Sequence, residues 1–296
     1  MRSRSPAGDT PGTTDRSQTE DGQRHRGGGR RRLYIVGIGP GGPEHLSQRA
    51  ARVLETVDAV AGYTTYIDLI RPLITGKQIV STAMKKEVDR VSAALDLALS
   101  GTTCAVVSSG DPGVYAMAGL VLEMCRERAI AIGGSERAED SDRLLVEVVP
   151  GIPALCAGAS LLGAPLTHDF AAISLSDLLT PWKTIETRVD AAARADFVIV
   201  IYNPKSRRRA DHLARAQQII LRHRDPATPV GIVTGAMREN QRVTITTLAD
   251  LHRGDVDMQT IVFVGNSSTF SYDGFMITPR GYAKKYDIGT SETATP

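Results

Sequence analysis

The sequence predicts an α/β protein made of two α/β domains. Short apolar segments of strand length, such as LYIVGIG at 33–39 and FVIVIY at 197–202, alternate with longer amphipathic segments. This alternation occurs in both halves of the chain and is interrupted near Pro150 to Pro153. A chain of 296 residues is too long for one small domain and suits two medium-sized ones. Strands that alternate with helices are typical of parallel or mixed sheets covered by helices.

The N-terminal half is expected to begin at Leu33. Residues 1–32 contain almost no aliphatic side chain, so they predict a disordered, Arg-rich tail. Pro43 suits the first position of a helix, and residues 83–99 place apolar side chains at helical spacing. The expected elements are, in order, a strand at 33–39, a helix at 43–57, a strand at 58–63, a helix at 83–99, a strand at 104–110, a helix at about 114–128 and a strand at 144–151.

The C-terminal half repeats the alternation. Its small-residue first helix permits close packing, and its later strands end in Gly, Asn or Ser. The expected elements are a helix at 153–163, a strand at 171–176, a helix at 184–194, a strand at 196–204, a basic helix at 206–224 and strands at 229–235, 243–251 and 260–268. The predicted organisation is therefore a tail at 1–32, domains at 33–150 and 151–283, and a frayed end at 284–296.

Charge and composition exclude several classes of protein. The formal net charge is +2, but the first 32 residues hold eight Arg and four Asp or Glu, which leaves 27 basic and 29 acidic residues in the remainder. We therefore expect no nucleic-acid-binding body. No apolar run approaches membrane-spanning length. Three Cys without paired spacing argue against a disulfide framework or a metal site, and the N-terminus has no secretory h-region, so a cytoplasmic protein is expected.

Glycine-rich loops follow several of the predicted strands. GIGPGG at 37–42 satisfies the letters of a dinucleotide fingerprint, but no acidic residue follows the second strand until Asp68. Pro40 also removes a backbone donor from that loop. The motif alone leaves a tight turn, a nucleotide site and another ligand site open. SSGDPGVYAMAG at 108–119 is more elaborate than a turn requires, and Asp111 suits either a helix cap or a ligand contact.

Six segments in order resemble the tetrapyrrole methylase family. They are VGIGPGGPEHLS at 36–47, GYTTYIDLI at 62–70, SSGDPGVYAMAG at 108–119, VVPGIPA at 148–154, YNPKS at 202–206 and VTGAMRENQ at 233–241. The resemblance covers about residues 33–282 and is strongest to the members that methylate C17 of precorrin-3B. It implies two α/β domains with S-adenosylmethionine in the cleft between them, a tetrapyrrole substrate, ring contraction to precorrin-4 in corrin (cobalamin) synthesis, and a homodimer.

The family's motifs carry over to individual residues. Those expected to bind the cofactor are Pro40, Ser109, Gly110, Asp111, Val114, Pro153, Ala154, Tyr202, Asn203, Gly235 and Ala236. The acetate and propionate arms of the substrate need cations, for which the candidates are Lys85, Lys86, Arg90, Lys205 and Arg238. Sirohaem-forming relatives have an acidic residue near the end of the second strand. This chain has GYTTY there, so Tyr63 is a nearby candidate for proton transfer, and His168 in a later loop is another. For each residue taken singly, a structural role, as a packed aromatic or a loop-bracing His, is the more common one.

Three alternatives remain open from the sequence. The first is a C17-methyltransferase that acts on cobalt-factor III, because neither substrate requires a metal ligand from the protein. The second is a dinucleotide-binding oxidoreductase, based on the first glycine loop. The third is a tetrapyrrole-binding protein without activity, which a degraded SGDP loop would favour; here that loop is intact.

Overall fold

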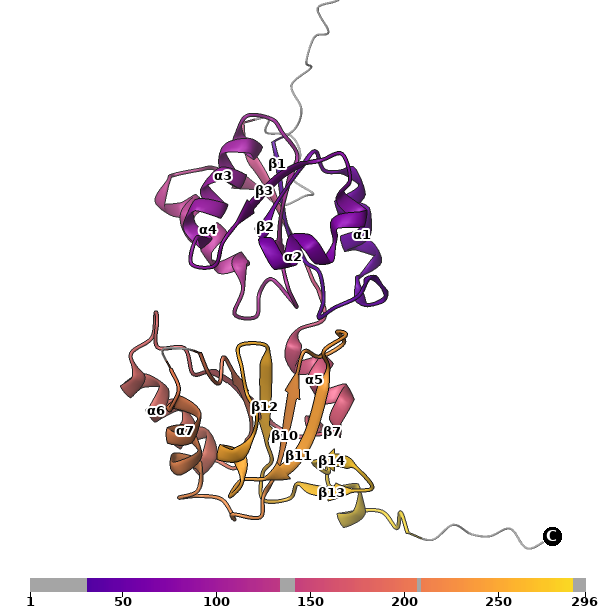
Figure 1. The fold of residues 1–296 in the computed structure, drawn as a ribbon, viewed down its shortest axis with the longest axis vertical. Coiled ribbons are helices and arrows are strands. Elements are labelled where there is room, and N and C mark those ends of the chain that lie inside the picture. The colour runs from indigo at the N-terminus through magenta and orange to yellow at the C-terminus, as the bar shows by residue number, and fades with distance from the viewer. Residues whose placement is uncertain (1–30, 134–141, 207–208, 290–296) are drawn as a thin grey trace, which may run out of the picture.

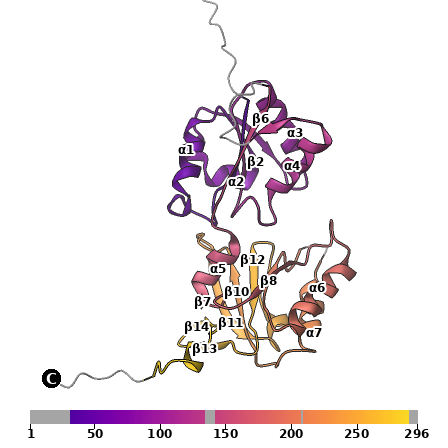
Figure 2. The same cartoon turned by 180° about the vertical axis from the view of Figure 1, so that it is seen from behind.

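A computed structural model describes residues 31–133, 142–206 and 209–289 of the chain. Within these residues, the N-terminal and C-terminal halves each build a main β-sheet, and the two halves lie one above the other (Figures 1 and 2). The predicted α/β class is confirmed. Residues 1–30, which make up most of the predicted tail, and residues 290–296 lie outside the described residues. Strand β1 (Arg32–Gly37) begins one residue before the predicted onset.

The N-terminal sheet is parallel throughout, in the order β3-β2-β4-β1-β6-β5. Its other strands are β2 (Ala59–Tyr63), β3 (Gln78–Thr82), β4 (Cys104–Ser108), β5 (Ile132–Gly133) and β6 (Leu144–Val149). Its helices are α1 (Gln48–Thr56), α2 (Thr64–Leu69), α3 (Glu87–Leu99) and α4 (Met117–Glu127), with short 3₁₀ turns at Pro43–His45 and Arg71–Ile74.

Both faces of this sheet are covered, because alternate residues of each strand point to opposite sides. Leu33 and Ile35 of β1 pack with the side chains of α3 and α4. Tyr34 and Val36 of the same strand pack with those of α1 and α2. The continuous apolar run that predicted a buried parallel strand is therefore explained by two helix layers.

The C-terminal sheet is mixed, in the order β11-β10-β12-β9-β8. Its strands are β8 (Phe170–Ser174), β9 (Val198–Tyr202), β10 (Pro229–Thr234), β11 (Arg242–Thr247) and β12 (Thr260–Val264). β8 and β9 are parallel, whereas β12 is antiparallel to both β9 and β10. The start of β12 therefore lies beside the ends of β9 and β10, and the three segments meet at one edge.

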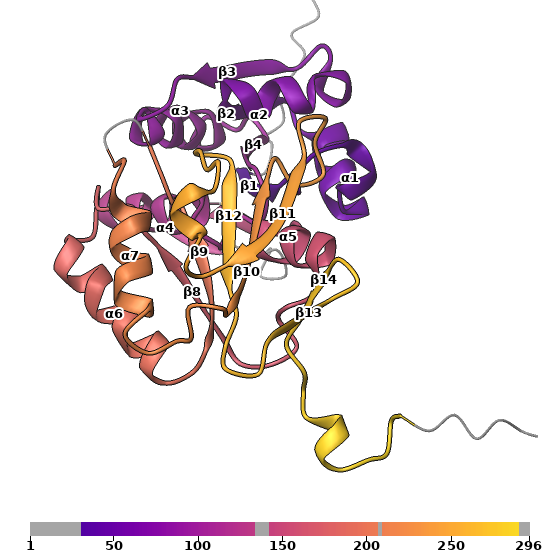
Figure 3. The same ribbon diagram turned by 60° about the horizontal axis from the view of Figure 1, so that its bottom comes forward.

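Helices cover this sheet unevenly. α6 (Trp182–Arg194) and α7 (His212–Ile220) pack on one face, and α5 (Ala154–Leu162) packs on the other (Figure 3). A small third sheet joins β7 (Gly163–Ala164), β14 (Phe275–Ile277) and β13 (Phe270–Tyr272) at the far end of α5, and 3₁₀ turns occupy Leu251–Arg253 and Tyr282–Lys284.

Several element boundaries differ from the sequence predictions. The predicted helix at 43–57 is split, because Ser47 caps α1 with its Oγ, which accepts the Ala50 N–H at 3.1 Å. The predicted helix at 206–224 is confined to α7. Strand β3 and the small third sheet were not predicted, because β3 is mostly exposed and carries no apolar run. β6 ends at Val149 and α5 begins at Ala154, so we propose to keep the domain division at 150/151.

Candidate functional site

A cavity of about 420 Å³ lies where loops of the two halves meet. Loops that follow β1, β2, β4 and β6 line it from the N-terminal half, at the carboxyl edge of the parallel sheet, where α/β folds bind ligands. Loops that follow β9 and β10, and the start of β12, line it from the C-terminal half. All eleven residues that we expected to bind the cofactor line this cavity, and so do Tyr63 and Arg238.

Three N-terminal loops are held together by very close backbone contacts. Gly39 and Gly110 exchange two hydrogen bonds, from the Gly110 N–H at 2.8 Å and the Gly39 N–H at 3.2 Å. A Cβ on Gly37 would lie 2.6 Å from the Gly110 oxygen, and one on Gly151 would lie 2.2 Å from it. These contacts leave no room for side chains, so glycine is required by close approach and not only by turn geometry.

Asp111 ties the second of these loops to the connection between the halves. Its Oδ1 accepts the Gly113 N–H at 2.8 Å, and its Oδ2 accepts the Gly151 N–H at 3.1 Å. Both carboxylate oxygens therefore have backbone partners. Asp111 therefore shapes the cavity wall. Of the two roles that the sequence suggested, this one resembles the helix cap more than the ligand contact.

Arg238 crosses from the C-terminal half to the N-terminal loops. Its Nε donates to the Pro40 carbonyl oxygen at 2.6 Å and its Nη2 donates to Ser109 Oγ at 2.9 Å. The neighbouring Met237 oxygen comes so close to Gly41 that a Cβ there would lie 1.9 Å from it. Arg238, predicted as a substrate-binding cation, is thus occupied in joining the two walls of the cavity.

Tyr115 makes a second connection between the halves. Its hydroxyl donates to the Ala172 carbonyl oxygen of β8 at 2.9 Å, and its ring lies 4.9 Å from that of Tyr202. Tyr115 and Asn203 adopt left-handed backbone conformations, with φ of 52° and 51°. Non-glycine residues in this region cost of order 1–3 kcal/mol each and cluster at ligand sites.

Burial keeps three of the cavity tyrosines protonated. Desolvation raises the pKa of Tyr202 to about 12, and its hydroxyl oxygen accepts the Leu155 N–H at 3.0 Å, in the first turn of α5. Desolvation also raises the pKa of Tyr66 and of Tyr115. These three phenols are therefore available as hydrogen-bonding groups at neutral pH and not as bases.

The other predicted residues lie outside the cavity lining. His168 precedes β8, at the opposite edge of the sheet from the cavity; its side chain is 40% exposed and its Nδ1 accepts the Asp169 N–H at 2.8 Å. Lys85, Lys86 and Lys205 are exposed. Arg90 is buried, where it donates to Thr82 Oγ1 and the Ala83 oxygen.

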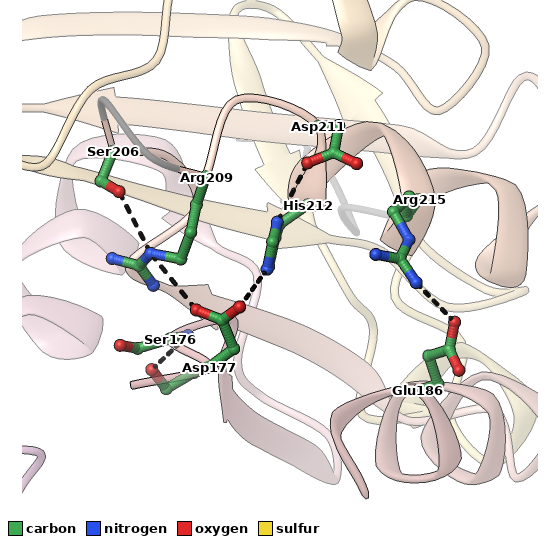
Figure 4. Close-up of polar contacts among 9 residues, drawn as sticks. Ser176, Asp177, Glu186, Ser206, Arg209, Asp211, His212 and Arg215 are labelled. Atoms are coloured by element: carbon green, nitrogen blue, oxygen red, sulfur yellow. Dashed lines mark hydrogen bonds and ion pairs between the residues drawn. The ribbon is translucent and has the colours of Figure 1, made fainter. Parts of the chain in front are cut away.

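The YNPKS segment divides between two environments. Tyr202 and Asn203 line the cavity, whereas Ser206 belongs to a polar cluster beside α7 (Figure 4). In that cluster Asp177 accepts from His212 Nε2 at 3.1 Å, and Arg209 Nε donates to Ser206 Oγ at 3.1 Å. The cluster ties the loop after β9 to the loop after β8, and the Arg209 side chain is engaged within it.

Sequence reasoning missed part of the lining. The missed residues are Thr65, Tyr66, Met84, Glu87, Tyr115, Met258, Gln259, Thr260 and Ile261. Tyr66 and Tyr115 fall inside segments that were quoted for the resemblance, so those segments contained the signal. The stretch 258–261 contained no such signal. It includes the beginning of the antiparallel strand β12, whereas the predicted loops follow the ends of strands.

The family model for tetrapyrrole (corrin/porphyrin) methylases matches residues 32–252. The chain belongs to the tetrapyrrole methylase family. Among its relatives, a cobalt-factor III methyltransferase of Priestia megaterium is 49% identical over 88% of this chain and 47% of its own length. A probable cobalt-factor III C(17)-methyltransferase of Salmonella typhimurium is 46% identical over 84% of this chain and 99% of its own length.

Solved structures of tetrapyrrole methylases share this architecture. The crystal structure of the methyltransferase CobJ superposes with a TM-score of 0.75 at 33% identity and covers 83% of this chain and 99% of its own. A uroporphyrin-III C-methyltransferase from Thermus thermophilus, solved with S-adenosylhomocysteine, shares the fold with a TM-score of 0.58 at 23% identity, over 79% and 97% of the two chains. The tetrapyrrole methylase fold predicted from the sequence is confirmed. The chain spans about half the length of the Priestia relative.

Two further features of the described residues concern metal ions and membranes. No three His, Cys, Asp or Glu side chains in the described ranges gather in a way that would hold a metal ion. Within those same ranges, none of the helices has both the length and the apolar character needed to cross a bilayer.

Proposed function

We propose that this member of the tetrapyrrole methylase family transfers a methyl group from S-adenosylmethionine to C17 of a corrin precursor, with contraction of the macrocycle, in cobalamin biosynthesis. The observation that carries the proposal is the cavity between the halves, lined by all eleven of the expected residues. Its volume of about 420 Å³ lies within the usual range of small-molecule sites, about 300–1,000 Å³.

The lining suits S-adenosylmethionine chemically. Pro40, Val114 and Ala236 supply apolar wall, and Ser109 and Asn203 supply a few polar groups, as expected of a nucleoside site. The bound sulfonium would supply an already activated methyl group. The protein then needs chiefly to align methyl and acceptor carbon and to exclude water. Loops from both halves, joined through Arg238 and Tyr115, provide such an enclosure.

The dinucleotide alternative fits the first glycine loop poorly. Gly39 uses both its N–H and its carbonyl group to pair with Gly110, so its N–H does not face a phosphate. The first N–H groups of α1 also begin several residues after Gly42, and Ser47 already caps them. A pyrophosphate normally sits directly on such a helix start. If calorimetry showed tight NADH binding and no binding of S-adenosylhomocysteine, the methyltransferase proposal would be wrong.

The form of the substrate is the finer part of the proposal. The sequence resemblance implied metal-free precorrin-3B, which would give precorrin-4. The names of the Priestia and Salmonella relatives favour cobalt-factor III instead. Parallel incubations with labelled S-adenosylmethionine and each substrate, read by mass spectrometry, test both. Methylation of neither substrate, with intact folded protein, would contradict the proposal.

We also propose that the chain acts as a homodimer. Leu178 and Leu179, in the loop between β8 and α6, are 74% and 93% exposed. Adjacent exposed leucines are the kind of apolar surface that a subunit contact covers. Light scattering coupled to size exclusion should give twice the chain mass, and Leu179→Glu should shift it toward the monomer; a wild-type monomer at assay concentration would refute the dimer.

A further inference from the structure

Two carboxylates line the cavity among the residues that the structure describes: Asp111 and Glu87. Asp111 is fully engaged, since its two oxygens accept the backbone N–H groups of Gly113 and Gly151. Glu87, the first residue of α3, is half-buried, and its Oε1 accepts the Lys85 N–H at 3.1 Å. Its carboxylate is thus held at the cavity with capacity to accept a further proton or hydrogen bond.

The other titratable groups of the described lining are four phenols and one guanidinium. Burial raises the pKa of Tyr66, of Tyr115 and of Tyr202, so these phenols stay protonated at neutral pH. Arg238 is positively charged and bonded to the N-terminal loops. Tyr63 packs edge-on against Tyr66, with ring centroids 5.2 Å apart. Glu87 is therefore the carboxylate of the described lining that retains free acceptor capacity.

The backbone before α3 is arranged around this carboxylate. Lys85 has a φ of 68°, a left-handed conformation that a β-carbon disfavours. The N–H of this strained residue is the group that holds Glu87 Oε1. Strain of this kind persists only where the surrounding structure imposes it, and it concentrates at functional sites. The position of Glu87 is therefore maintained against a local conformational preference.

A buried cation stands behind Glu87 on the same helix. Arg90 is 3% exposed, and its guanidinium contacts Thr82 Oγ1 at 2.9 Å and Met117 Sδ at 3.7 Å. Burial lowers the pKa of Arg90, and the charge of Glu87 opposes that effect by raising it. Arg90 thus places a buried positive charge near the Glu87 carboxylate.

We propose that Glu87 is the catalytic base that removes the proton released as the tetrapyrrole is methylated. The inference rests on the proposed function. When the S–CH₃ bond breaks, its electron pair stays on sulfur, and the ring carbon supplies the pair for the new C–CH₃ bond. The positive charge of the sulfonium thereby passes to the macrocycle, and one proton must leave to give a neutral product. That proton passes to the Glu87 carboxylate and then to solvent.

The test compares three variants in the full chain. Glu87→Gln keeps the size and the acceptor for the Lys85 N–H but removes the base. Turnover with S-adenosylmethionine and the tetrapyrrole that wild type methylates should fall by about 100-fold or more, the usual contribution of general-base catalysis. Glu87→Asp should recover part of the rate. Asp89→Asn is the matched control, because it makes the same charge change on the same turn at a residue that pairs with exposed Lys86.

Ligand binding and thermal stability separate this role from a structural one. Glu87→Gln should bind S-adenosylhomocysteine with wild-type affinity and melt at the wild-type temperature. The proposal would be overturned if Glu87→Gln turned over at the wild-type rate, or if Asp89→Asn lost as much turnover as Glu87→Gln. If wild type itself methylates no tetrapyrrole, it is the proposed function that fails.

Discussion

The Arg238 guanidinium joins the two halves of the molecule through the Pro40 carbonyl group, 198 residues away in the chain, with a distance of 2.6 Å between Nε and oxygen. The same side chain donates to Ser109 Oγ at 2.9 Å. One planar donor thus bonds two different N-terminal loops, each of which lines the cavity. Arginine suits this task because its donors diverge in a fixed plane.

Arg238→Lys should therefore weaken ligand binding although it keeps the charge. Lysine carries a single ammonium and cannot reproduce both contacts from one rigid group. Loss of one charge-assisted hydrogen bond costs about 1.5–3 kcal/mol, which corresponds to about a 10- to 150-fold loss of affinity if it is expressed in binding. Calorimetry with S-adenosylhomocysteine measures the change. Arg242→Lys, at an exposed pair with Asp255, is the control, and equal affinities in wild type and Arg238→Lys would contradict the prediction.

Asp111→Ala should destabilise the chain as well as weaken binding. The substitution leaves the N–H groups of Gly113 and Gly151 without their carboxylate partner. The Gly113 N–H is exposed and can bond to water, but the Gly151 N–H is partly buried. Leaving such a donor unpaired costs about 1–3 kcal/mol, so thermal unfolding should begin at a lower temperature. Asp111→Asn should show a smaller loss, since its amide oxygen can still accept one N–H. A variant that lost affinity at unchanged melting temperature would instead show direct contact with the ligand.

The sequence predicted the loops of the site better than their side chains. Strands that end in Gly or Pro indicate loops at the carboxyl edge of a parallel sheet. Because β1 and β4 are neighbours in that sheet, their loops meet and Gly39 pairs with Gly110. Arg90 was expected to be a cation available to the carboxylate arms of the substrate, because charged side chains are seldom buried. Its burial depends on partners from β3 and α4, Thr82 and Met117, which helical periodicity cannot reveal. Helical periodicity could not single out Glu87 either, because this residue lies within a run of charged residues.

Gly41→Ala should loosen the contact between the halves. Its added Cβ would lie 1.9 Å from the Met237 carbonyl oxygen, so one loop must move. Because Met237 adjoins Arg238, the movement should also disturb the Arg238 contacts and lower the affinity for S-adenosylhomocysteine. Gly119→Ala is the control: its Cβ would meet nothing within 4 Å inside α4, and alanine stabilises a helix interior by about 0.5–1 kcal/mol relative to glycine. Opposite shifts in melting temperature are expected, and equal shifts would refute the argument.

Tyr202 should make the protein sensitive to alkaline pH. Burial raises its pKa from 10.0 to about 12, so the folded state binds the phenolic proton more tightly than the unfolded state does. The resulting stabilisation is fully present below pH 10 and is lost as the pH rises through the folded-state value of about 12. Tyr66 and Tyr115, whose pKa values are raised in the same direction by burial, should add to this loss.

Tyr202→Phe separates this effect from general alkaline unfolding. The variant should be less stable at neutral pH, because the Leu155 N–H loses its acceptor at the start of α5, at a cost of about 1–3 kcal/mol. Its stability should nevertheless fall less steeply with rising pH than that of wild type, since one linked proton has been removed. Urea unfolding at a series of pH values measures both quantities. Tyr272→Phe, at a side chain that is 69% exposed, should follow the wild-type slope; if Tyr202→Phe follows it too, the proton on Tyr202 does not contribute to the stability of the fold.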